Sequence, residues 1–126
     1  MQTKLIILLS SLLILLITSC VPRSTLKINN TPDNTLNNTC TISGYIIDTQ
    51  TKEPLIGANI VLNLTEYKAV TDKDGYFEIK NVQPGSYRVK ASYIMYDDYD
   101  KSKIKFEGNI RYSLNIELLC KYDVID

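Results

Sequence analysis

The sequence predicts an all-β protein, built as an antiparallel β-sandwich of about seven short strands. From Thr39 onward, apolar and polar residues alternate with the period of two that is typical of half-buried strands. Turn residues such as Asp-Gly and Pro-Gly separate the alternating segments, and no stretch after residue 20 shows a convincing helical pattern. These observations indicate strands that each turn one face toward a shared core.

The chain begins with an apolar segment that is typical of an export signal. One positive charge in "MQTK" precedes residues 5–17, "LIILLSSLLILLI". This run is shorter than the roughly 20 residues that a helix needs to cross a bilayer core. A branched apolar residue, two small residues and Cys20 end it, which resembles a bacterial lipobox. An ordinary signal peptide and an uncleaved short anchor are the alternatives.

The lipobox resemblance implies that residues 1–19 are a lipoprotein signal peptide, removed just before Cys20. The Cys20 thiol would then carry diacylglycerol, and the new amino terminus would usually be acylated as well, with a fatty acid such as palmitate. Acyl chains contribute about 0.8 kcal/mol per buried methylene, so they can hold a small protein on a membrane without a spanning helix.

Residues 20–38 are predicted to be a flexible, disordered tether. The sequence "VPRSTLKINNTPDNTLNN" after Cys20 is rich in Asn, Thr and Pro and shows no apolar period. Such a segment cannot bury enough apolar surface to offset the entropy lost on ordering. The folded domain is therefore expected over residues 39–120, followed by a short tail over residues 121–126.

Alternating segments account for the predicted domain in chain order. Cys40, Ile42 and Ile46 share one parity in the first of them. In each later segment, residues of one parity are apolar and residues of the other are mostly polar, so one face of each strand should lie in the core. These later segments are residues 58–64, 77–80, 87–93, 103–107 and 111–118.

Two short segments between the strands are predicted to be bends. Residues 72–75, "DKDG", end in Asp-Gly, and tight hairpins favour this pair, so we expect Gly75 to have a positive φ. Residues 83–86, "QPGS", combine proline with glycine in the same way. A loose calcium site on Asp72 and Asp74 is the alternative for the first bend, although the glycine and glutamate spacing of an EF-hand is missing.

The composition argues against catalysis and against nucleic-acid binding. The chain has 126 residues with 14 basic and 14 acidic side chains, so no charge excess attracts nucleic acid. It has no histidine, which removes Ser-His and Cys-His nucleophile pairs and the usual zinc ligands. We therefore predict no catalytic residue, no cofactor and no enzymatic activity.

Residues 93–100, "YIMYDDYD", form an acidic and aromatic stretch that could recognise a ligand. Exposed tyrosines beside carboxylates offer flat apolar faces and hydrogen-bond acceptors to a sugar or a protein loop. The candidate ligand-binding residues are Tyr96, Asp97, Asp98 and Tyr99. The alternative, which we favour, is a loop in which one tyrosine anchors the core.

Cys40 and Cys120 are predicted to form a disulfide. After export the chain meets an oxidising compartment, and lipid on Cys20 leaves an even pair of thiols. Cys40 is in phase with Ile42, and Cys120 with Leu118, so both thiols should face the core. The bond requires the first and last strands to run side by side or to meet at the sandwich edge. Two free thiols, buried as small apolar residues, are the alternative.

Two longer segments resemble the carboxypeptidase regulatory-like domain, a transthyretin-like (prealbumin-like) β-sandwich. They are "ISGYIIDTQTKEPLIGANIVL" and "VTDKDGYFEIKNVQPGSYRVKASYIMY". The matching features are Gly44, the entry to the second strand at residues 54–58, the bend at residues 71–77 and the Pro-Gly-x-Tyr at residues 84–87.

The resemblance extends over roughly residues 41–118 and implies an accessory or interaction module, because activity in such proteins belongs to other domains. Similar modules occur at the amino terminus of many TonB-dependent outer-membrane receptors. The family commonly has a glycine before an aromatic residue after the long strand. This chain has Met95 before Tyr96 at that point.

Together these features predict a lipoprotein of the bacterial cell envelope, anchored by lipid to a membrane, with the outer membrane favoured. Its non-catalytic β-sandwich would bind an unidentified envelope protein or serve as a structural accessory. A carbohydrate-binding module that holds a surface glycan on exposed tyrosines is the alternative.

Overall fold

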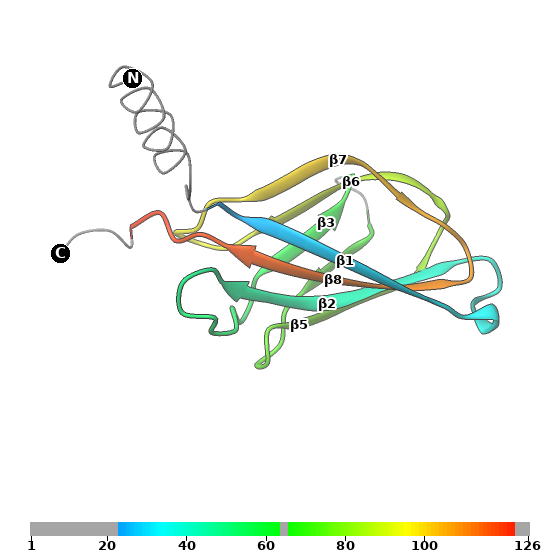
Figure 1. Cartoon of the computed structure of the whole chain (residues 1–126), viewed down its shortest axis with the longest axis horizontal. Helices are drawn as coiled ribbons and strands as arrows, with labels where there is room; N and C mark the ends of the chain where they lie inside the picture. Colours follow the sequence, from blue (N-terminus) through cyan, green and yellow to red (C-terminus); the bar gives the residue numbers. More distant parts are fainter. Residues whose placement is uncertain (1–22, 64–65, 123–126) are drawn as a thin grey trace, which may run out of the picture.

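The computed structural model describes residues 23–63 and 66–122, which form a two-layered β-sandwich (Figure 1). Eight strands lie within these residues, in place of the about seven that were predicted. They are β1 (Thr25–Pro32), β2 (Cys40–Asp48), β3 (Asn59–Leu62), β4 (Lys68–Val70), β5 (Tyr76–Val82), β6 (Gly85–Ser92), β7 (Tyr99–Phe106) and β8 (Ile110–Leu118). A short 3-10 helix, η1 (Asn34–Leu36), lies between β1 and β2. The predicted fold class is confirmed.

Each layer is a four-stranded sheet. In the first, called sheet A, the strand order is β1-β8-β2-β5, and in the second, sheet B, it is β4-β3-β6-β7. Strand β2 pairs with β8 in parallel, from Cys40 opposite Ile110 to Asp48 opposite Leu118. The other strand pairs are antiparallel. A parallel pair requires a long connection, and here that connection supplies all of sheet B and strand β5.

The core lies between the two sheets and follows the predicted alternation. Its largest fully buried side chains are Phe77, Phe106, Ile42, Ile46, Ile60, Leu62, Leu114, Ile116, Leu118, Val82 and Val89. Phe106 and Tyr112 pack edge to face, with 4.8 Å between their ring centroids. The apolar parity that was predicted for each strand is therefore the inward parity of the sandwich.

Strand β1 corrects the predicted tether. It pairs with β8 along its whole length, from Thr25 opposite Glu117 to Pro32 opposite Ile110. The prediction of a flexible tether is therefore wrong from Thr25 onward. As an edge strand with an almost wholly exposed surface, β1 is held mainly by backbone hydrogen bonds, so its sequence needs no apolar period.

The predictions for the amino-terminal segment concern residues that lie outside the described part of the chain. The predicted signal peptide, residues 1–19, and Cys20 lie outside the described residues, as does most of the predicted tail. Over residues 23–63 and 66–122, no helix is long and apolar enough to cross a bilayer.

The register of β2 and β8 also overturns the predicted disulfide. Cys40 lies opposite Ile110, and Cys120 lies beyond the far end of β8, about 30 Å away at roughly 3.3 Å per residue. A disulfide needs Cα atoms within about 7 Å of each other. Both thiols are free, and burial raises the pKa of the Cys40 thiol to about 11. Parity gives the face on which a side chain lies but not its position along the strand.

The bend at residues 72–75 forms as predicted, but it is not a hairpin. Gly75 has a φ of 74°, which confirms the expected positive value. Its backbone nitrogen donates to the Asp72 carbonyl oxygen over 3.0 Å. The flanking strands, β4 and β5, belong to different sheets, so the bend carries the chain from one layer to the other.

Gly44 allows the central strands of sheet A to approach each other, and its replacement should be costly. A Cβ atom at this position would lie 1.7 Å from the Leu114 carbonyl oxygen, so one strand would have to move. We predict that Gly44→Ala lowers the free energy of unfolding by at least about 3 kcal/mol, measured by urea denaturation.

Gly57→Ala is the matched control for this prediction. Gly57 has a φ of 84°, but no atom lies within 4 Å of an added Cβ, so only left-handed backbone strain remains. That strain should cost about 1 kcal/mol. Equal losses in the two variants would contradict the role given to the β2–β8 approach.

Candidate functional site

The predicted ligand-binding stretch, residues 93–100, forms the connection between β6 and β7 and the first two residues of β7. Tyr96 and Tyr99 are half-buried and pack against the core. The Tyr93 and Tyr96 rings meet edge to face, with 5.4 Å between their centroids. Tyr96 forms a bridge to Cys120, so the connection folds back onto the end of β8, and Tyr96 and Tyr99 are only partly exposed.

Tyr96 is held by a buried carboxylate. Its hydroxyl donates to Asp48 Oδ2 over 2.6 Å, while Asp48 Oδ1 accepts from the backbone nitrogens of Gln50 (2.7 Å) and Thr51 (2.9 Å). Burial opposes ionisation of Asp48, but these hydrogen bonds outweigh it and keep the pKa below its ordinary value. The hydrogen bond to Asp48, together with burial, raises the pKa of Tyr96. Tyr96 thus anchors its loop, as the favoured alternative proposed.

The acidic members of the predicted site lie at the surface. Asp97 and Asp98 are exposed, and Lys90 Nζ lies 3.5 Å from Asp98 Oδ2. The exposed apolar side chains of this connection are Ile94 and Met95, which the prediction did not include.

Asp72 and Asp74, the alternative calcium ligands, are part of a turn. Asp72 Oδ1 accepts from the backbone nitrogens of Asp74 (2.8 Å) and Tyr76 (3.0 Å). Across the described part of the chain, no group of three or more His, Cys, Asp or Glu side chains is placed to hold a metal ion. The Asp72 carboxylate therefore stabilises its own turn.

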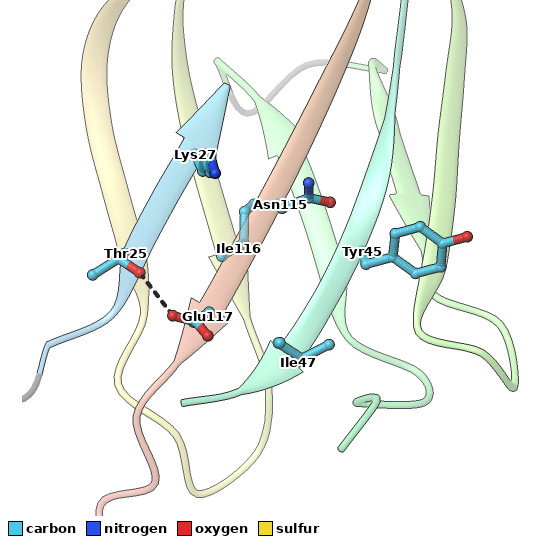
Figure 2. Close-up of a pocket in the computed structure, with 7 residues that line it drawn as sticks. All are labelled: Thr25, Lys27, Tyr45, Ile47, Asn115, Ile116 and Glu117. Atoms are coloured by element: carbon cyan, nitrogen blue, oxygen red, sulfur yellow. Dashed lines mark hydrogen bonds between the residues drawn. The ribbon is translucent and has the colours of Figure 1, made fainter. Parts of the chain in front are cut away.

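The outer face of sheet A carries a depression of about 260 Å³ that the sequence did not reveal. Its lining comes from β1, β8 and β2 and consists of Thr25, Lys27, Tyr45, Ile47, Asn115, Ile116 and Glu117 (Figure 2). We call the outward-facing members of this set, all except Ile116, the sheet-A patch. The strand register explains how it forms, because Lys27 and Tyr45 flank Asn115 in one row and Thr25 and Ile47 flank Glu117 in the next.

The sheet-A patch has an aromatic side and a polar side. The Tyr45 ring is 48% exposed, and its centroid lies 5.3 Å from that of Tyr76 on β5. On the other side, Glu117 accepts a hydrogen bond from Thr25 over 3.4 Å and pairs with Lys52 Nζ at 2.5 Å. An exposed ring beside amide, ammonium and carboxylate groups suits recognition of another molecule rather than catalysis.

One signal in the sequence could have indicated this patch. In the run Tyr45-Ile46-Ile47, apolar side chains occupy both parities of β2, although only Ile46 is needed in the core. Apolar residues at outward positions break the pattern of a half-buried strand and favour a contact surface. The polar members could not be found in this way, because outward polar residues are ordinary on strands.

Comparison with known proteins agrees with this architecture. Residues 42–122, more than half of the chain, match the CarboxypepD_reg-like domain. The chain belongs to this family. Over 85 residues it is 32% identical to the TonB-dependent transporter Oar of Myxococcus xanthus. The matched region covers 63% of this chain and 8% of the transporter. The chain thus spans only a small part of that relative's length.

Two solved structures are similar to this CarboxypepD_reg-like domain. Both are interface mutants of a type II cohesin–X-dockerin complex from Acetivibrio cellulolyticus. One chain in each is 33% identical, over 60% of this chain and 51% of that chain, with TM-scores of 0.50 and 0.49.

Met95 stands where the family resemblance leads us to expect a glycine, and its backbone is left-handed. Its φ is 70°, and the Tyr96 nitrogen donates to the Tyr93 carbonyl oxygen over 3.1 Å. Residues 93–96 therefore form a tight turn in which Met95 takes the position that usually requires glycine. The chain keeps the turn that a glycine would make but adds an exposed side chain to it.

The Tyr96–Asp48 hydrogen bond should stabilise the domain. We predict that Tyr96→Phe lowers the free energy of unfolding at pH 7 by about 1–3 kcal/mol, because a buried carboxylate loses a donor. The loss should shrink as the pH falls through the lowered folded-state pKa of Asp48, because the protonated carboxyl gains less from this donor.

Tyr99→Phe is the control for this measurement. Within the described residues the Tyr99 hydroxyl makes no hydrogen bond, so its removal should change stability by less than about 0.5 kcal/mol. Chemical denaturation from pH 3 to pH 7 measures both variants. If Tyr96→Phe matched Tyr99→Phe at pH 7, Tyr96 would not be an anchor.

Proposed function

We propose that this chain is a lipid-anchored, non-catalytic accessory protein of the bacterial cell envelope, and that the sheet-A patch binds another envelope protein. The observation that carries the proposal is the half-exposed Tyr45 at the side of a depression formed by β1, β8 and β2. Protein interfaces commonly place an aromatic residue at their centre and polar groups around it.

Family membership supports the proposal. Residues 42–122 belong to the CarboxypepD_reg-like family, and the similar Oar protein is named a TonB-dependent transporter. A module shared with such a transporter fits an envelope location and a role in contacts between proteins. The similar chain in the cohesin–X-dockerin complex also belongs to a protein assembly.

The proposal gives the chain no catalytic residue. The sequence contains no histidine, and the buried carboxylate of Asp48 already accepts three hydrogen bonds. A carboxylate occupied in this way, with a lowered pKa, is a poor proton donor near neutral pH. Its place in the fold is that of a loop anchor.

The glycan alternative has less support at Tyr96 and Tyr99, because both are half-buried and offer a ligand only part of their surface. A sugar ring could stack on Tyr45 instead, so the experiment must separate a protein partner from a glycan. Crosslinking in intact cells can do this when it is combined with glycan-binding measurements on the purified protein.

The partner is tested with a photo-crosslinking amino acid at Lys27, on the rim of the sheet-A patch. We predict one discrete crosslinked envelope protein, and at least a tenfold loss of crosslinking when Tyr45→Ala is added, as expected for a central interface residue. The same probe at Lys68, which is exposed on sheet B, should give no such product.

Two results would contradict the proposed interface. One is equal crosslinking from positions 27 and 68, and the other is crosslinking that does not change in Tyr45→Ala. If the purified protein binds a glycan through Tyr45 and no protein is captured, the glycan alternative replaces the proposed partner.

The anchor is tested separately at Cys20. We predict that Cys20→Ala abolishes incorporation of radiolabelled palmitate and releases the protein from the membrane fraction. Cys120→Ala removes a half-buried thiol far from the lipobox in sequence and should leave the labelling unchanged. Palmitate labelling that survives Cys20→Ala would show that the lipobox assignment is wrong.

A further inference from the structure

Three of the most exposed large apolar side chains gather at one end of the sandwich. Ile94, Met95 and Tyr122 are 79%, 59% and 71% exposed. The Lys121 nitrogen donates to the Met95 carbonyl oxygen over 2.9 Å, so the turn at residues 93–96 is joined to the segment that carries Tyr122. We call these three side chains the apolar tip.

The beginning of the described chain is attached to the same end. Ser24 Oγ donates to the Asp97 carbonyl oxygen over 3.0 Å and accepts from the Leu119 nitrogen over 3.2 Å. The Asp97 nitrogen donates to the Leu119 carbonyl oxygen over 2.8 Å. Figure 1 shows the start of β1, the connection from β6 to β7 and the end of β8 together at this end. Ser24 therefore lies beside the apolar tip.

The distance from this end to Cys20 is limited by the length of the chain. Ser24 follows Cys20 by so few residues that even a fully extended backbone spans no more than about 14 Å. If Cys20 carries acyl chains, the tip cannot lie far from the bilayer surface. The predicted long tether would have allowed such separation, but β1 removes most of it.

We propose that the apolar tip contacts the lipid bilayer in which the Cys20 acyl chains are inserted, and thereby fixes the orientation of the sandwich. The proposal rests on the proposed lipidation of Cys20. Isoleucine and methionine side chains can enter the acyl region, and tyrosine favours the boundary between headgroups and acyl chains. The occupant of this surface is therefore a lipid bilayer rather than a second protein.

The backbone of Met95 supports a role for its side chain outside the fold. A φ of 70° is disfavoured for every residue with a Cβ, and glycine would adopt it without strain. The side chain is mostly exposed, so the core gains little from it. A membrane contact explains why an apolar side chain occupies a position at which the fold alone favours glycine.

The charges at this end indicate that the contact is apolar rather than electrostatic. Arg23 and Lys121 are exposed there, but so are Asp97 and Asp98, and Asp98 is paired with Lys90. No basic cluster is present in these described segments to attract anionic headgroups. Contact should therefore depend little on the fraction of anionic lipid or on salt concentration.

The test uses the mature, membrane-extracted protein in vesicles of phosphatidylethanolamine and phosphatidylglycerol that contain a radiolabelled phospholipid. Benzoyl-phenylalanine replaces Tyr122 in one protein and Lys105, which is exposed at the other end of the sandwich, in its control. We expect phospholipid crosslinking from position 122 to exceed that from position 105 at least tenfold. In the protein labelled at position 122, Ile94→Asp with Met95→Asp should reduce crosslinking at least fivefold.

Met95→Gly separates the membrane contact from folding. It removes one apolar side chain and the backbone strain together, so it should reduce phospholipid crosslinking from position 122 while thermal stability is kept or increased. If the variant lost crosslinking because it unfolded, its thermal stability would fall as well. Reduced crosslinking at unchanged or higher thermal stability therefore indicates a lost membrane contact. Crosslinking that Met95→Gly and the double aspartate variant both leave unchanged would overturn the proposal.

A failure of the membrane contact can be distinguished from a failure of the proposed Cys20 acylation. Mass spectrometry of the purified protein shows directly whether Cys20 is acylated. If it is not, Cys20 is coupled to a maleimide phospholipid in a Cys120→Ser background, and crosslinking from position 122 is read again. Equal phospholipid crosslinking from positions 105 and 122, or crosslinking to a second protein chain from position 122, would show that the tip does not face lipid.

Discussion

The parallel pairing of β2 with β8 is the constraint on which the rest of the structure depends. It brings an early strand of the sandwich beside the last one, and it leaves the other edge of β8 free for β1. Because β2 and β8 run in the same direction, a long connection must join them, and this connection contains all of sheet B. The close approach at Gly44 is possible only because no Cβ lies between this strand and the Leu114 backbone.

The sequence predicted which side chains enter the core, but not how far along the sheet they lie. Side chains in a strand point alternately to the two faces of the sheet, so the alternation of apolar and polar residues was enough to place Ile42 and Leu114 in the core. Alternation has the same form in parallel and antiparallel strands, so direction and register were not predictable. The disulfide error followed from this limit, since Cys40 and Cys120 share a core-facing parity but lie toward opposite ends of the sheet. Strand β1 was missed because an edge strand can be stabilised by backbone hydrogen bonds without an apolar pattern.

The candidate site was harder to predict, because its members come from strands that are distant in sequence. Lys27, Tyr45 and Asn115 become neighbours only through the register of β1, β8 and β2. Local composition pointed to the tyrosines of the β6–β7 connection instead. Composition identifies side chains that are able to bind, whereas exposure depends on tertiary contacts, and the bond from Tyr96 to Asp48 turns one of these tyrosines inward.

The two proposed surfaces together restrict the kind of partner that the domain can meet. Asp48, Leu118 and the apolar tip lie at the same end of the sandwich, and Tyr45 lies only about 10 Å from that end along β2. If the tip rests on a bilayer, the strands stand away from the membrane and the outer face of sheet A faces sideways. Tyr45 is then held close to the lipid surface, within reach of the part of a neighbouring protein that emerges from the same bilayer. A polymer further from the membrane could not reach the patch without bending toward the lipid, so this geometry favours a membrane-embedded protein over a distant glycan.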